Sequence, residues 1–186
     1  MSFLDKLAAK VLPEVTDQDR AEARTKAEAL SQSHRWLAMV IDHHRQIESA
    51  LTRARTGFDT AGRKQALKEL MLVLNGHSLA EETVLYPALA EHAEKAHAAM
   101  AYEEHSMTKI EMHLLEHLDP MSQEWLDKLG HIEGALLHHI YHEENNWLPD
   151  LAEKAGGESE RLSQRFAEEF HRYGGVAIEE PLSEPA

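Results

Sequence analysis

The chain has 186 residues and no Cys, so it can bury a sizeable core, while disulfides, zinc ribbons, iron–sulfur clusters and thiol nucleophiles are excluded. Its formal net charge of −14 argues against nucleic acid or an anionic membrane surface as a partner. The sequence shows no secretory signal and no apolar run of about 18 residues, and we therefore expect a cytoplasmic protein.

The first predicted elements are a short helix and a long one. Residues 2–12 place apolar side chains at helical spacing before Pro13, which predicts an amphipathic helix that packs on the outside of the domain or forms a dimer contact. With Asp17 as N-cap, one long helix is predicted from about Gln18 to Arg55. His44 lies in the middle of its apolar stripe and is predicted to face the core.

Three further long helices are predicted, and each carries one His in its core-facing stripe. They run from about Thr60 to Tyr86 with His77, from about Lys95 to Leu118 with His105, and from about Gln123, capped by Ser122, to Leu148 with His139. Pro87 and Pro149 are expected to end or kink two of them. Because strand signals are missing and the connections are short, we predict an all-α, up-down-up-down four-helix bundle.

The chain is predicted to end in an extension of the bundle. Residues 158–173 fit one more amphipathic helix, and the tail from Gly174 has the composition of a disordered segment. The predicted organisation is an N-terminal helical extension over residues 1–16, the bundle over residues 17–155, and a C-terminal helix and tail over residues 156–186.

A repeated motif gives the clearest indication of function. The stretch from His77 to Pro87 has the frame H-x3-E-E-x2, then two apolar or aromatic residues and Pro, and the stretch from His139 to Pro149 repeats it 62 residues later (139 − 77). Residues four apart share one face of a helix, so each frame pairs its His with its first Glu. A His and a carboxylate from each of two helices are typical of a carboxylate-bridged metal pair in a helical bundle.

Together, the stripes and the frames direct six metal-ligating side chains toward one core: His44, His77, Glu81, His105, His139 and Glu143. Each alone fits a structural histidine or a salt bridge. Burying all six is costly unless they are satisfied together, and a metal cluster would do so. The pattern therefore favours a metal site over a purely structural bundle.

These motifs resemble the hemerythrin-like family, also called the HHE cation-binding domain. The matching pieces are Asp42 to Ile47, the two H-x3-E-E frames through their prolines, and Glu104-His105, so the resemblance covers about residues 30–150. It implies a non-haem centre of two iron ions with an oxo or hydroxo bridge. The terminal ligands would be His44, His77, His105 and His139, and the bridging carboxylates would be Glu81 and Glu143.

The third helix departs from the oxygen-carrying members of this family. Those carriers have His-x3-His there, whereas His105 is followed at that spacing by Lys109 and preceded by Ala101. One imidazole is thus missing, unless His43 or His142 is recruited. Fewer protein ligands leave positions for water, peroxide or another small ligand, which favours sensing or redox chemistry over reversible oxygen carriage.

The fourth helix departs as well. The carriers have His-x4-Asp, whereas this chain offers both His139-x3-Glu143 and His139-x4-Glu144, so Glu144 stays an alternative to Glu143 as bridge. His138 and the other flanking histidines are expected to be solvated or to support the ligands. Tyr102, about one turn before His105, would orient a bound ligand or merely pack.

Two functions are compatible with this reading. The first is a di-iron protein that binds or senses dioxygen, nitric oxide or iron. The alternative is a di-iron enzyme that decomposes hydrogen peroxide or otherwise protects against oxidative or nitrosative stress. In either case the expected partner is a small diatomic or peroxide ligand, and the chain is expected to be a monomer or homodimer.

Overall fold

The computed structural model describes residues 15–174, which form helices and connections without any β-strand. The predicted all-α fold class is therefore confirmed for this part of the chain. The predicted helix over residues 2–12 and the predicted disordered tail lie outside the described residues. No helix between residues 15 and 174 is long and apolar enough to cross a membrane.

The first described segment differs from the single long helix that we predicted. It consists of two helices, α2 (Asp17–Ser31) and α3 (Arg35–Thr56), with a break between them. At the break, His34 has an extended backbone, and its Nδ1 lies 3.0 Å from the hydroxyl of Ser159 in a distant helix. Contacts far along the chain thus override the helical periodicity of the sequence. The N-cap of α2 is also Thr16 rather than Asp17.

The second segment continues beyond the predicted end of its helix. Helix α4 (Thr60–Ala80) leads into the π-helical segment η1 (Glu81–Leu85) and then into α5 (Tyr86–His92). In η1 the backbone N–H of Tyr86 bonds the carbonyl of Glu81, five residues back. Pro87 follows directly and has no N–H to donate, so the wider turn accommodates it without ending the helix.

The remaining segments repeat this pattern. Helix α6 spans Lys95–Glu116, α7 spans Gln123–His142, the π-helical segment η2 spans Glu143–Trp147, and α8 spans Leu148–Lys154. Ser122 caps α7 as predicted, since its hydroxyl accepts from the backbone N–H of Trp125. Pro149 is accommodated in the same way as Pro87. A 3-10 turn (Gly156–Glu158) then leads to α9 (Ser159–Gly174), close to the predicted range.

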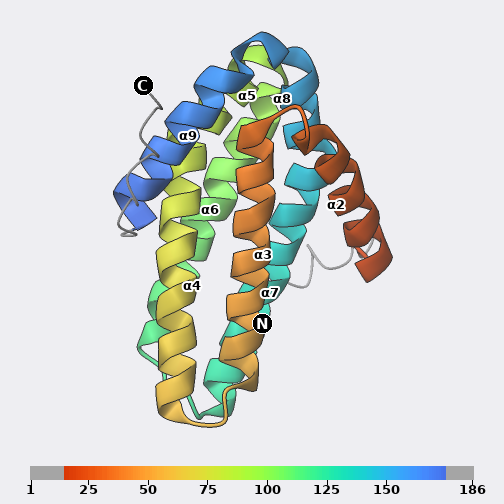
Figure 1. The fold of residues 1–186 in the computed structure, drawn as a ribbon. Coiled ribbons are helices and arrows are strands. Elements are labelled where there is room, and N and C mark those ends of the chain that lie inside the picture. Colours follow the sequence, from red (N-terminus) through yellow and green to blue (C-terminus); the bar gives the residue numbers. More distant parts are fainter. Residues whose placement is uncertain (1–14, 175–186) are drawn as a thin grey trace, which may run out of the picture.

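Figure 1 shows how the helices are arranged. Helix α3 lies beside α4 and α7, and α6 lies beside α7. Helix α2 folds back on α3 and also contacts η2, whereas α9 lies across α4 and α3. The two outer helices therefore cover different sides of the long ones.

The apolar core is divided into two clusters along the long helices. One contains Trp36, Leu37, Ile41, Tyr86, Trp147 and Phe166, and the other contains Ile47, Leu51, Leu70, Leu74, Trp125 and Ile132. His44 follows Ile41 of the first cluster and precedes Ile47 of the second on α3. His44, which was predicted to face the core, thus lies at the boundary between the two apolar clusters.

Candidate metal centre

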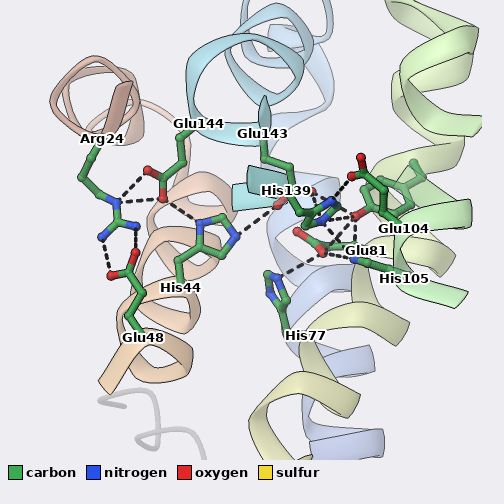
Figure 2. Close-up of polar contacts among 11 residues, drawn as sticks. Arg24, His44, Glu48, His77, Glu81, Glu104, His105, His139, Glu143 and Glu144 are labelled. Carbon is green, nitrogen blue, oxygen red and sulfur yellow. Dashed lines mark hydrogen bonds and ion pairs between the residues drawn. The ribbon is translucent and has the colours of Figure 1, made fainter. Parts of the chain in front are cut away.

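The structure brings the six predicted side chains together in one buried cluster (Figure 2). They come from α3, α4 with η1, α6, and α7 with η2: His44, His77, Glu81, His105, His139 and Glu143. None is exposed by more than 4 %. Such burial is costly for charged and polar groups that have no compensating partner.

Two sets of ligand atoms within this cluster are placed to hold a metal ion. One set comprises His44, His77, Glu81 and Glu143, and the other comprises Glu81, His105 and His139. In each set one ligand atom per residue lies within 4.8 Å of all the others. We call them the first and second metal positions. Because Glu81 belongs to both, the two positions share a carboxylate.

The two carboxylates of the cluster each face both halves of the chain, of which the first comprises α3, α4 and η1 and the second comprises α6, α7 and η2. Glu143 Oε2 lies 3.1 Å from His44 Nε2, and its Oε1 lies 3.5 Å from His139 Nε2. Glu81 Oε2 lies 3.2 Å from His77 Nε2 and 3.6 Å from His105 Nε2. Each carboxylate therefore lies between an imidazole of its own helix and one from the other half, as a bridging ligand would.

The second Glu of each frame contacts the outer nitrogen of a histidine instead. Glu144 Oε1 lies 2.7 Å from His44 Nδ1, and Glu82 Oε1 lies 3.0 Å from His105 Nδ1. A carboxylate on Nδ1 fixes the tautomer of an imidazole and leaves Nε2 free for a metal. Glu144 thus lies on the far side of His44 from the centre, which supports Glu143 as the bridge.

Each of these outer carboxylates is held by a cation. Arg24 of α2 donates from Nε to both oxygens of Glu144, at 2.8 and 2.7 Å, and from its terminal nitrogens to Glu48 (Figure 2). Lys109 donates to Glu82 at 2.6 Å. Lys109 therefore bonds an outer carboxylate. Sequence reasoning missed Arg24, because α2 reaches the site only through the break that precedes α3.

Tyr86 is the other residue that sequence reasoning missed. Its hydroxyl lies 2.9 Å from His105 Nε2 and 3.3 Å from His139 Nε2, and it lies within donating distance of Glu143 Oε1 at 3.0 Å. The signal was present, since the first frame has an aromatic residue directly before its Pro. Tyr102 points elsewhere and donates to the backbone carbonyl of Glu82 at 2.6 Å.

The two candidates for an additional imidazole lie outside both metal positions. The ring of His43 stacks on Phe170 of α9 with 3.8 Å between centroids. The ring of His142 stacks on Trp147 at 5.5 Å. Within the described chain, neither joins a set of metal-ligating groups.

A comparison with family models agrees with this geometry. The model described as the hemerythrin HHE cation binding domain matches residues 25–151. The chain belongs to this family. Comparisons with curated proteins and with solved structures found no match. The HHE domain is a cation-binding domain, and its His and Glu groups are placed here to hold a metal ion.

The electrostatics of this HHE domain fit a bound cation. Burial and the nearby charge of Glu143 raise the pKa of Glu81. Burial would also raise the pKa of Glu143, but the charge of His139 and a hydrogen bond with His44 lower it to about 2. Burial alone would lower the pKa of His44, yet its bonds to Glu143 and Glu144 raise it to about 9. Positive charge between the two central carboxylates would therefore favour the ionised form of both.

Unsatisfied atoms point the same way. Glu81 Oε1 and His77 Nδ1 are buried and have no hydrogen-bond partner among the described residues. The other oxygen of Glu81, Oε2, faces two imidazoles, and a carboxylate combined with imidazoles is a donor set that suits iron, manganese or zinc. The residues present therefore fit the cation that the family implies.

Proposed function

We propose that the chain is a non-haem di-iron protein whose two ions are bridged by Glu81 and Glu143. The observation that carries this proposal is the sharing of Glu81 between the two metal positions. His44 and His77 would hold the first ion, and His105 and His139 the second. This assignment fits an up-down-up-down four-helix arrangement of α3, α4, α6 and α7, with ligands from all four.

We further propose that the centre binds or senses a small ligand, such as dioxygen or nitric oxide, or iron itself. Bound iron would supply open coordination positions and redox chemistry. The set of ligating residues at the second position has three members, against four at the first. Helix α6 supplies no further imidazole beside His105, because position 101 is Ala and Lys109 bonds Glu82. An exogenous ligand would therefore bind at the second position.

Tyr86 favours a second candidate function, the decomposition of hydrogen peroxide into water and dioxygen. Burial and the charge of Glu143 raise the pKa of Tyr86, so the hydroxyl keeps its proton at neutral pH. That proton lies beside His105 and His139, where an exogenous ligand would bind. A positioned proton donor is what general acid catalysis requires.

The test is metal analysis combined with an optical spectrum of the protein loaded anaerobically with iron, recorded before and after addition of dioxygen and of peroxide. We expect about two iron ions per chain and a spectrum that changes on oxidation. Lasting peroxide consumption with dioxygen release would select the enzyme. A reversible spectral change with dioxygen or nitric oxide would select the binding protein. A chain that retains at most one ion would contradict the proposal.

A further inference from the structure

A second pair of histidines converges on the outer side of α7. Nε2 of His138 and Nε2 of His142 lie 3.2 Å apart. The two residues are four apart in sequence and therefore share one face of the helix. Both side chains are partly buried, so the pair remains accessible to water. It belongs to neither metal position of the proposed centre.

The separation of these nitrogens suits metal ligation. Imidazole nitrogens that each lie about 2.0–2.1 Å from a zinc ion at ordinary bond angles are roughly 2.9–3.4 Å apart. The proposed centre offers an internal comparison, since His105 Nε2 and His139 Nε2 lie 3.1 Å apart. A hydrogen bond between His138 and His142 would give a similar distance, so an experiment must separate the two.

The rings around this pair are held in place. His142 stacks on Trp147, with 5.5 Å between centroids and 17° between planes. The ring of His97 in α6 also stacks on Trp147, with 5.6 Å between centroids. A fixed ring loses little freedom when it binds an ion, which favours binding.

We propose that His138 and His142 form an additional site for one divalent transition-metal ion. Two protein ligands leave the other coordination positions to water, unlike structural zinc sites, which use four protein ligands. An ion held in this way exchanges readily. His138 adjoins His139 and His142 adjoins Glu143, so the site is one residue away from two ligands of the centre.

This location assigns a loading role to the site: it captures an iron(II) ion before the ion enters the centre. The role rests on the proposed di-iron function, whereas the site itself does not. Glu104 contacts the outer nitrogen of His139, with 2.7 Å between Glu104 Oε2 and His139 Nδ1. The Glu104 side chain is 30 % exposed. A partly exposed carboxylate there supplies negative charge between solvent and the second position.

In the binding test, zinc is titrated into the iron-loaded protein and the heat of binding is measured by calorimetry. We expect one additional zinc ion per chain with micromolar affinity. His138→Ala/His142→Ala should weaken this binding by at least about tenfold, because both ligands are lost. His138→Ala alone should have a similar effect and keeps the stacking on Trp147. Unchanged stoichiometry and affinity in these variants would overturn the site.

His113→Ala/His117→Ala is the matched control, since these exposed residues have the same spacing at the C-terminal end of α6, where His117 is the C-cap. The additional ion should survive this change, and its loss here would overturn the assignment to α7. The loading role is tested by the rate at which the protein takes up iron(II). We expect the α7 variant to load several-fold more slowly to the same final content. An unchanged rate would overturn the loading role, and a low iron content in the wild type would contradict the di-iron proposal instead.

Discussion

The two halves of the site are built from the same pattern and differ in their surroundings. The first half comprises α3, α4 and η1, and the second comprises α6, α7 and η2. Each provides one His from its first helix and an H-x3-E-E frame that enters a π-helical segment at its first Glu. The second Glu of each frame contacts the His of the other half: Glu82 contacts His105, and Glu144 contacts His44. The halves are therefore interdependent.

The difference lies at the residue before each first His. In the second half this residue is Glu104, whose carboxylate bonds His139 Nδ1. In the first half it is His43, which lies near His77 with 5.7 Å between ring centroids. His77 Nδ1 and His43 Nδ1 are both buried without a partner among the described residues. Burial lowers the pKa of His43 to about 4, so His43 stays neutral at neutral pH.

The outer helices reinforce this difference. Phe166 and Phe170 of α9 stack on His43 and cover the first half. Beside the second position, Glu104 is 30 % exposed and Lys109 is 40 % exposed. The same pattern thus gives one metal position backed by the aromatic rings of α9 and one flanked by two partly exposed charged side chains. We infer that exogenous ligands bind at the second.

Removing a carboxylate that lies between the two halves of the site should have the largest effect. Glu81→Ala and Glu143→Ala should each abolish loading of two ions, because Glu81 belongs to both metal positions and Glu143 lies beside His44 of the first and His139 of the second. Metal analysis after anaerobic iron loading should show at most one ion per chain. Exposed Glu103→Ala should leave the content unchanged. If Glu144→Ala abolished the pair and Glu143→Ala did not, the assignment of the bridge would be wrong.

Removing the metal tests whether both halves depend on the same ions. The metal-free chain leaves four imidazoles and two carboxylates buried without their common partner, so it should be less stable. An ion present at about a thousand times its dissociation constant stabilises by about 4 kcal/mol. At about 2–4 °C per kcal/mol, the melting temperature should fall by roughly 10 °C on chelation. Coincident thermal melts with and without metal would show that the cluster is no metal site.

Tyr86 belongs to the first H-x3-E-E frame in sequence but contacts the imidazoles of the second position. Tyr86→Phe keeps the ring and removes the hydroxyl, so iron content should be retained. If Tyr86 supplies a proton, peroxide consumption should slow by roughly 100-fold, the lower end of general acid effects. Tyr102→Phe is the control, because that hydroxyl bonds a backbone carbonyl away from the imidazoles. Equal rates in the wild type and Tyr86→Phe would remove Tyr86 from the chemistry.

The crossed outer carboxylates should give the smallest effects. Glu82→Gln and Glu144→Gln should each lower metal affinity by about 10–100-fold, because they orient ligands without holding the metal. Glu144→Gln should have the larger effect, since it also removes one of the two carboxylates that hold Arg24. Competition with a chelator measures both. Glu111→Gln, which removes only an ion pair with Lys128, should match the wild type.

The sequence predicted which side chains face the central cluster, because helical spacing is a local property of the chain. Residues four apart share a helix face, so the two frames placed Glu81 and Glu143 beside their histidines in any helical fold. Periodicity likewise placed His44 and His105 in the apolar stripes. Whether all six side chains hold a metal stays a prediction.

The outer part of the site could not be predicted because it depends on contacts between helices. Helical geometry directs Glu82 away from the metal face, and no local rule shows that it meets His105 of another helix. Arg24 lies in a polar, Ala-rich stretch that reaches Glu144 only because the chain breaks before α3. The prolines indicated an end or a kink in each helix, whereas the π-helical segments carry the helices past them.

The central claim is that the two halves hold two inequivalent iron ions and that the second position is the open one. Mössbauer spectroscopy of protein loaded with isotope-enriched iron(II), before and after addition of nitric oxide, tests it most directly. The account predicts two signals of equal area, only one of which changes with nitric oxide, and that signal should be the one perturbed by His105→Ala. A single signal, or an equal response of both ions, would contradict it.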